Sequence, residues 1–418
     1  MLSINRWCGV RTYSSTHRLI KFTTRQALWD SCNENITLSK LRNAYLTGKF
    51  QIVPSVEGSE CTPELNSNRS LPIVKFPKDQ IFLEVTNDPK IGNWRKPVVK
   101  LFRLGKAIFK LYNQGLKNTW HVYKDTKQLA KQYQESDLVT PFFKAIEFKE
   151  IESRLLKDNS EISLPVNRKQ FQELQRRSEF WKIPGFVVLL IALEEFITVF
   201  CYIFPSITPW NCLIPSVFKK ISDSQAVHRN SEKSVSSIRG DENRGVPKYR
   251  SPYTLPYDEL HRFVLTRNLI PRWKMFIYKL ANNRTIPSES ITRLHQYLFV
   301  DDWLLSRHVL SRDTVTKLSD RELVNTVLER QLYYRGEDLN SMVQNDLGKN
   351  VLVWRLIIYW SFRLDGTISA NVGEEELKDF PLFSEKWGVN NVGILNFAGS
   401  EALVTDKDIE VLQEGGNK

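Results

Sequence analysis

Two adjacent carboxylates, Glu194 and Glu195, stand near the middle of an apolar stretch, where an ionised side chain is costly. A charge in such a place must face protein or water, or be protonated, so both residues are candidates for a proton or cation site. The structural alternative is that one carboxylate accepts a hydrogen bond from a neighbouring helix or a partner subunit. Because the chain has a single apolar span, any ion path through it would require an oligomer.

The apolar stretch runs from Ile183 to Phe204 and contains no lysine or arginine. Its 22 residues would form a helix of roughly 33 Å, enough to cross a hydrocarbon core of about 30 Å. Three prolines follow within residues 205–215 and end the helix. We therefore predict a transmembrane helix with a proline-rich exit over residues 183–218, with a buried helix of a soluble protein as the alternative. Basic clusters flank both sides, so charge does not orient the span.

A strongly basic stretch precedes this span. Residues 93–133 carry ten basic side chains against Asp125 alone, and apolar residues recur there at near-helical spacing. This pattern predicts basic amphipathic helices within residues 93–182. Such helices suit an anionic membrane surface first; RNA and an ordinary solvated face are the alternatives. The candidate membrane or ribosome contacts are Lys100, Arg103, Lys106, Lys110, Lys117, Arg176 and Arg177.

The N-terminus reads as a targeting segment. Residues 1–29 contain five basic residues, many serines and threonines and no acidic residue, which is typical of a mitochondrial transit peptide. An unbroken apolar stretch, which a secretory signal needs, is missing. We assign the transit peptide to residues 1–35 and expect residues 36–92 to be poorly structured.

The C-terminal half reads as helical after a polar linker at residues 219–250. Within residues 251–365, helical periodicity covers 257–269 and 273–280, Ser288 is a candidate N-cap, and Ser319 with Glu322 has capping-box spacing. The apolar segment 351–362 is too short to span a membrane and is expected to be a core helix. Residues 366–418 carry ten acids against four lysines and form an acidic tail.

The whole chain has 418 residues and a formal charge of +12, which favours acidic partners such as RNA or anionic lipid. Five cysteines and six histidines are dispersed, and motifs such as CxxC or HExxH do not occur. The sequence thus gives no support for a disulfide framework, a metal site, a cofactor or enzymatic chemistry.

Four motifs in order resemble the LETM family of mitochondrial inner-membrane proteins. These are a region around Gly115 to Lys117, the helix at 171–177, the segment from Glu194 to Phe218, and a block containing Leu318 to Leu323. The positions that match family motifs are Pro205, Pro215, Phe218, Asp301, Asp302, Ser319, Glu322 and Arg330.

This resemblance implies an all-α protein with a single transmembrane helix, basic amphipathic pre-membrane helices and a C-terminal helical matrix domain. It implies a single-pass protein of the mitochondrial inner membrane, whose matrix domain binds mitochondrial ribosomes and supports respiratory-chain biogenesis and ion homeostasis. Expected partners are the ribosome, anionic lipid and other LETM-type subunits. The alternative function is an oligomeric potassium/proton or calcium/proton exchanger that uses Glu194.

Overall fold

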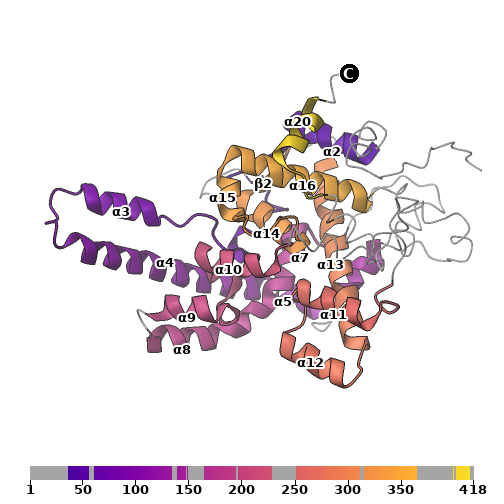
Figure 1. The fold of residues 1–418 in the computed structure, drawn as a ribbon, viewed down its shortest axis with the longest axis horizontal. Helices are drawn as coiled ribbons and strands as arrows, with labels where there is room; N and C mark the ends of the chain where they lie inside the picture. The colour runs from indigo at the N-terminus through magenta and orange to yellow at the C-terminus, as the bar shows by residue number, and fades with distance from the viewer. Residues whose placement is uncertain are drawn as a thin grey trace, which may run out of the picture.

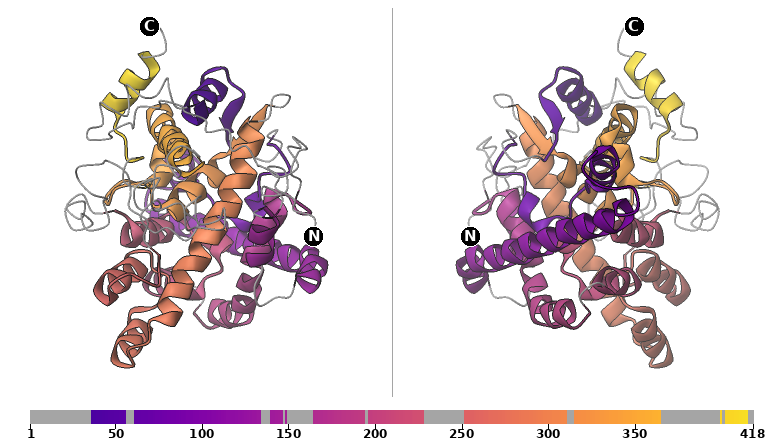
Figure 2. Two further views of the ribbon diagram at one scale, coloured as in Figure 1. Left: turned by 90° about the vertical axis from the view of Figure 1, so that its right-hand side faces the viewer. Right: turned by 90° about the vertical axis from the view of Figure 1, so that its left-hand side faces the viewer.

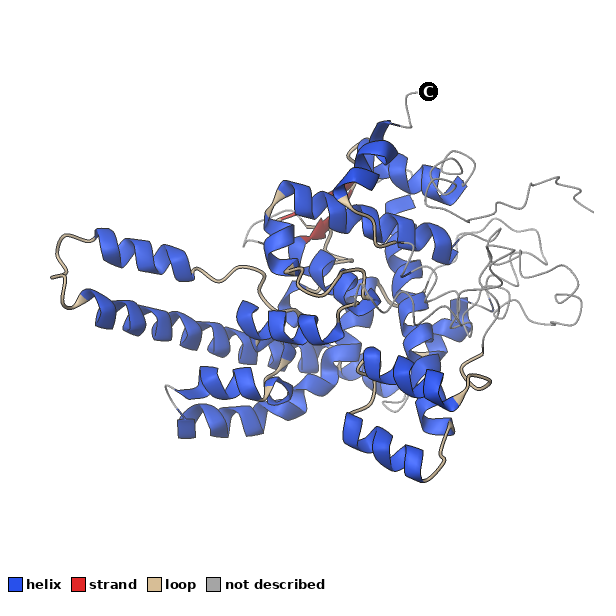
Figure 3. Ribbon diagram, viewed as in Figure 1, coloured by secondary structure: helices blue, strands red, loops and turns tan. Residues whose placement is uncertain are grey.

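The computed structural model describes residues 36–55, 61–133, 139–146, 148, 164–193, 196–227, 251–310, 315–364, 399 and 402–414. The predicted transit peptide, most of the linker and most of the acidic tail lie outside these ranges, as do Glu194 and Glu195. Helices dominate what is described, in agreement with the predicted all-α class (Figure 3). Two short strands, β1 (Phe50–Val53) and β2 (Thr316–Ser319), form a parallel pair.

The main core surrounds α16 (Asp346–Leu364), in which every residue from 351 to 360 is buried. This confirms the core helix expected at 351–362. Its apolar side chains pack with those of α2, α14 and other elements in one cluster. The helices around α16 are α2 (Ile36–Leu46), α13 (Thr285–Leu310), α14 (Asp320–Arg330), α15 (Leu339–Gln344) and α20 (Asp406–Glu414).

The segment 36–92 differs from the expectation of a poorly structured region. It contains α2, β1, the short 3-10 helix η1 (Asn68–Ser70) and α3 (Lys78–Asn87). Leu38, Leu41 and Phe50 are buried in the same core as α16. The strand β1 is stabilised by pairing with β2, where Phe50 lies opposite Thr316. Partners so distant in sequence leave no local pattern, which is why the sequence did not reveal this part of the fold.

Two helix starts test the capping predictions. Ser319 caps α14, accepting a hydrogen bond from the Glu322 backbone N–H at 3.2 Å, as expected. The reciprocal bond of a capping box is absent, because the Glu322 carboxylate instead accepts from the Ser67 backbone N–H. Ser288 does not cap α13, which begins at Thr285; the Asn283 side chain accepts from the Thr285 N–H at 3.1 Å.

The basic stretch forms one long helix, α4 (Lys96–Asp125), whose N-terminal half extends from the body as an arm beside α3 (Figure 1). Shorter helices connect it to the following segment: α5 (Lys127–Gln132), α7 (Arg168–Gln175) and the 3-10 helix η2 (Arg176–Lys182).

The predicted transmembrane helix is not one helix. The apolar stretch forms α8 (Ile183–Leu193) and α9 (Ile197–Ile203), which fold back along each other below α4 (Figures 1 and 2). No helix within the described ranges is long and apolar enough to span a bilayer. The physical reason is that both helices bury one face against α4 instead of continuing in one direction.

The chain continues from this hairpin into the proline-rich exit and a separate helical group. The exit contains the 3-10 helices η4 (Pro205–Ile207) and η5 (Trp210–Cys212) and then α10 (Pro215–Gln225). Beyond the linker, α11 (Tyr257–Thr266) and α12 (Arg272–Leu280) pack with the N-terminal part of α13 in a second cluster. These helices match the periodicity predicted from the sequence.

Candidate functional site

The α8–α9 hairpin, residues 183–203, has a buried inner face. Phe186 of α8 and Ile197 and Cys201 of α9 are almost fully buried and pack on Tyr112 of α4 and Cys212 of η5. The Tyr112 and Phe186 rings meet edge to face with their centroids 5.3 Å apart. The hairpin therefore packs on the middle of α4, around Tyr112.

The outer face of the hairpin is apolar and exposed. The exposed fractions are 69% for Ile191, 70% for Phe196 and 56% for Val199. Soluble surfaces rarely carry contiguous apolar patches of this kind unless the patch contacts a partner or a membrane. Further exposed apolar side chains on these segments are Val188, Ile203 and Phe204.

Aromatic and cationic side chains gather at the base of the hairpin, where α8 begins and α9 ends. Trp181 is 71% exposed and precedes α8, and the half-exposed Tyr202 lies in the last turn of α9. Lys220 donates to the Tyr202 carbonyl oxygen at 2.7 Å, and its ammonium lies 4.5 Å from the Tyr202 ring. Lys182 pairs with Glu179 at 2.9 Å. Aromatic rings and lysines of this kind are enriched at membrane–water interfaces.

The basic contact candidates on α4 occupy two different environments. Lys106, Lys110 and Lys117 are exposed along α4. Lys100 and Arg103 lie against α3, where the Lys100 ammonium is 5.6 Å from the Phe82 ring and Arg103 is 3.9 Å from Asp88.

Arg176 and Arg177 are not part of that open surface. The Arg176 guanidinium lies 3.0 Å from a Glu329 carboxylate oxygen and donates to Asn325 at 2.8 Å. Arg177 stacks over the Tyr123 ring at 4.4 Å. These two arginines attach η2 to neighbouring elements and are half-buried.

Five predicted motif positions, by contrast, meet in the interior. Arg330 of α14 contacts Asp301 at 2.7 Å and Asp302 at 2.6 Å, and both aspartates come from α13. Arg168 of α7 lies 2.8 Å from Asp301 and 2.8 Å from Glu322. The side chains of the four predicted residues Asp301, Asp302, Glu322 and Arg330, and that of Arg168, are fully buried. Ser319, the fifth predicted position, caps the helix that carries Glu322 and Arg330.

Electrostatics distinguish the two neighbouring aspartates. Burial alone would raise the pKa of Asp301, but Arg168 and Arg330 outweigh it and lower that pKa to about 2. For Asp302 burial prevails over Arg330 and raises the pKa. Asp302 also accepts hydrogen bonds from Trp360 at 2.8 Å and Tyr359 at 3.2 Å. The network thus joins α7, α13, α14 and α16, and its role is structural.

Arg168 was missed as a site residue, since the sequence presents it only as one of several basic residues before the apolar stretch. A signal was available: Phe171 and Gln172 lie three and four positions further on and share its buried face of α7. The remaining motif positions are also structural. Pro205 begins η4, Pro215 is the first residue of α10, and Phe218 is buried in the main core.

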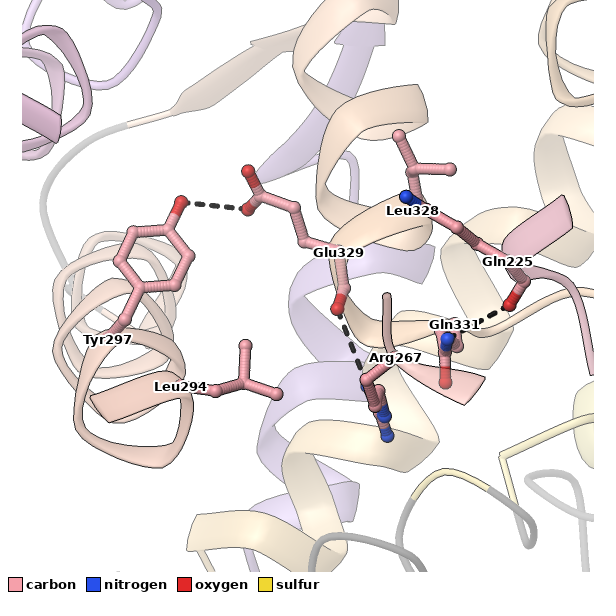
Figure 4. A pocket seen from close by; sticks show the side chains of 7 residues that line it. All are labelled: Gln225, Arg267, Leu294, Tyr297, Leu328, Glu329 and Gln331. Carbon is pink, nitrogen blue, oxygen red and sulfur yellow. Dashed lines mark hydrogen bonds between the residues drawn. The ribbon is translucent and has the colours of Figure 1, made fainter. Parts of the chain in front are cut away.

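A small cavity of about 160 Å³ opens between α11, α13 and α14 (Figure 4). Tyr297 donates to the Glu329 carboxylate at 2.9 Å, and burial raises the pKa of Glu329 despite the nearby Arg176. Arg267 donates weakly to the Glu329 carbonyl oxygen at 3.5 Å, and burial lowers its pKa to about 10, so it stays charged at neutral pH. The lining residues are Gln225, Arg267, Leu294, Tyr297, Leu328, Glu329 and Gln331.

In this cavity the Tyr297 hydroxyl pairs with the Glu329 carboxylate, and neither histidine nor cysteine is among the lining residues. Throughout the ranges that the structure describes, no three His, Cys, Asp or Glu side chains converge to hold a metal ion. The hairpin, with its exposed apolar face, is one feature suited to contact something outside the protein.

Comparison with known proteins gives two matches. A family model described as "Pentamidine resistance factor domain" (PNT1) matches residues 65–310, which include α4 and the α8–α9 hairpin. The chain is also 38% identical over 403 residues to "Pentamidine resistance factor, mitochondrial" of Saccharomyces cerevisiae, covering 88% of this chain and 92% of that protein. The relative's name supports the mitochondrial location predicted here. No solved structure matches the chain.

The resemblance to the LETM family is wrong, because the matched family is a different one. The motifs that suggested it describe general features of helical proteins: a serine N-cap before α14, a proline at the start of α10, and buried charges at Asp301 and Asp302. With the family match spanning more than half of the chain and a relative similar over most of both lengths, this protein belongs to the pentamidine resistance factor (PNT1) family.

Proposed function

We propose that this protein is a mitochondrial factor that binds the surface of the inner membrane through the outer face of the α8–α9 hairpin. The single observation that carries this proposal is the exposed apolar face of Ile191, Phe196 and Val199 on a hairpin whose other face is buried. The transit peptide predicted for residues 1–35 leads to the matrix side, so we infer that the matrix-facing leaflet is bound.

Length supports surface binding over spanning. At about 1.5 Å per residue, the 11 residues of α8 measure roughly 16 Å, about half of a hydrocarbon core of about 30 Å. Because the hairpin lies along α4, the outer face can enter the boundary between headgroups and acyl chains while the inner face stays packed. Trp181, Tyr202 and Lys220 at the base then lie at headgroup level.

Two contributions to membrane affinity are available: burial of apolar side chains and attraction of lysines to anionic lipid. Each fully buried Val, Ile or Phe contributes about 1.5–3 kcal/mol, and each lysine near an anionic surface contributes about 1 kcal/mol. At the hairpin itself, Lys182 and Lys220 stand beside Trp181 and Tyr202. The exposed lysines of α4, namely Lys106, Lys110 and Lys117, lie on the side of that helix opposite the residues that pack on the hairpin. Apolar insertion and attraction to anionic lipid are the two signals that stable attachment needs.

Flotation of the purified full-length protein with phosphatidylcholine vesicles, with and without cardiolipin, tests the proposal. We expect flotation with anionic vesicles and its loss in the double variant Ile191→Ser/Val199→Ser. The control is Leu347→Ser on α16, since Leu347 is as exposed, at 69%, but lies away from the hairpin. Equal flotation of the hairpin variant and the control would contradict the proposal.

The relative is named for pentamidine resistance, and we extend this phenotype to the present chain. Deleting the gene for this protein should make cells grow less well in the presence of pentamidine. Expressing the wild-type chain again should restore resistance. If membrane attachment is needed for this role, the hairpin double variant restores less resistance at equal protein level. Full rescue by that variant would separate the phenotype from the membrane surface.

A second candidate function is contact with RNA at the mitochondrial ribosome, which the basic arm of α4 favours. Trp94, just before α4, and Phe102, in its N-terminal half, are 76% and 74% exposed and lie between basic side chains. Lysines neutralise phosphates and aromatic rings stack on bases, so binding would weaken as salt is raised. Co-sedimentation with ribosomal particles at increasing salt tests this; an absence of ribosomal RNA at low salt would reject it.

A further inference from the structure

We infer that α12 is a second membrane-contact element, which binds the same anionic bilayer surface as the α8–α9 hairpin and fixes the orientation of the protein on it. This inference rests on the proposed membrane function and adds a separate contact site to it.

Helix α12 has one buried face and one apolar face open to solvent. Met275 is fully buried and packs with α11 and α13. Trp273, Phe276, Ile277 and Leu280 are 63%, 68%, 49% and 81% exposed. Their spacing of three, four and seven residues places them on one face of the helix, opposite the packed one. The exposed apolar face is therefore continuous along the helix.

The charges of α12 select an anionic partner. The helix contains three basic residues, Arg272, Lys274 and Lys279, and no acidic one. All three are exposed; the Lys274 ammonium lies 5.4 Å from the Trp273 ring, and the Lys279 ammonium lies 3.9 Å from the exposed Asp258 of α11. An apolar face with tryptophan, bordered by lysine and arginine, is the pattern of a helix lying in an anionic interface.

A second copy of the chain suits this face less well. A two-fold pair would place the same patch of each subunit against the other, so the cations of Arg272, Lys274 and Lys279 would approach their own copies. Like charges brought together in this way are unfavourable, whereas lipid phosphates would attract them.

Position provides the independent support. In Figures 1 and 2, α12 and the α8–α9 hairpin both lie along the lower edge of the molecule, while α2 and α20 lie at the opposite end. The apolar face of α12 points away from the body, because its other face packs on α11 and α13. One flat surface can therefore contact both elements, and two separated contacts define an orientation where one would not.

Vesicle binding by matched variants of the full-length protein tests this inference. The α12 variants are Phe276→Ser and, for charge, Lys274→Glu/Lys279→Glu. Leu347→Ser is the control for removing an exposed apolar side chain, since Leu347 is 69% exposed and Phe276 68%. We expect Phe276→Ser to bind phosphatidylcholine–cardiolipin vesicles about tenfold more weakly, as when one large apolar side chain no longer enters the interface. The charge variant should prefer cardiolipin less strongly than wild type, because the basic residues beside the hairpin remain, and the control should bind like wild type.

Hydrogen exchange adds a readout at the helix itself. Backbone amides of residues 272–280 should become more protected when cardiolipin vesicles are added to the wild-type protein. Unchanged binding of Phe276→Ser, with no protection of α12, would overturn the α12 inference, and so would a change in oligomeric size in place of vesicle binding.

The two proposals fail in different ways. If only the hairpin variant Ile191→Ser/Val199→Ser loses binding, the membrane function stands and the α12 contact is rejected. If the wild-type protein binds no vesicle, both are rejected.

Discussion

Arg168 and Asp301 are 133 residues apart in the chain, yet the Arg168 Nε atom lies 2.8 Å from an Asp301 carboxylate oxygen with both side chains fully buried. Neither charge stands alone: Arg168 also contacts Glu322, and Asp301 also contacts Arg330. Buried ions are tolerated only when such partners replace water. The pair therefore fixes α7 against α13 and α14 and holds the helices on either side of the hairpin to one core.

Replacing Arg168 with methionine should destabilise the protein strongly. The Asp301 and Glu322 carboxylates would lose a buried partner, and breaking such a pair costs about 3–5 kcal/mol. Urea unfolding followed by circular dichroism measures the change. Arg293→Met on α13 is the control, because Arg293 is exposed, and its change should be within about 0.5 kcal/mol of zero. Equal unfolding midpoints for the two variants would contradict the assigned role.

The helices of residues 251–365 could be predicted from the sequence because their signals are local. Periodicity, Pro271 before α12 and the Ser319 cap before α14 lie within a few residues of the elements they define. The same is true of α16, whose apolar run is continuous. The resemblance that gathered these signals into a family failed, because local signals of helix starts are shared by unrelated helical proteins.

The parts that could not be predicted depend on distant contacts. Strand β1 is stabilised by pairing with β2, and the sequence around Phe50 contains no local pattern that identifies β2 as its partner. The apolar stretch 183–204 has the length of a span, but its fold is decided by Tyr112 and Cys212, against which both hairpin helices pack. The exposed apolar face of α12 could not be predicted either, because helical periodicity does not indicate which apolar residues remain without a packing partner.

Replacing His295 with leucine should flatten the pH dependence of stability. His295 is fully buried, and neither ring nitrogen has a hydrogen-bond partner among the residues the structure describes. Burial, with Arg363 and Arg267 nearby, lowers its pKa well below the ordinary value of 6.5. The unfolded chain then binds a proton that the folded protein does not, so stability falls as pH drops below about 6.5.

At about pH 5 the loss due to this one histidine amounts to about 2 kcal/mol, which the leucine variant should not show. Urea unfolding at about pH 7 and about pH 5 measures the difference. His261→Leu, at a half-buried histidine of α11, is the control for replacing a histidine ring by leucine. A leucine variant of His295 with the wild-type difference would show that this ring is protonated in the folded state.

Two glycines of α4 should respond to alanine in opposite directions. A Cβ atom on Gly115 would collide with the Cys212 sulfur and lie 3.4 Å from the Cys212 Cα, where η5 crosses the helix. A Cβ on Gly105 meets nothing within 4 Å. Gly105→Ala should therefore raise the free energy of unfolding by up to about 1 kcal/mol, because alanine favours helix. Gly115→Ala should lower it by about 1–3 kcal/mol through overpacking.

The double variant Gly115→Ala/Cys212→Ala separates overpacking from other causes. Removing the Cys212 sulfur makes room for the new methyl group, so the double variant should be more stable than the sum of the two single changes predicts. Thermal unfolding of all four proteins gives this coupling. Strict additivity would mean that η5 does not approach α4 at Gly115, and the inner face of the hairpin, which packs on the same Cys212, would then lack its support.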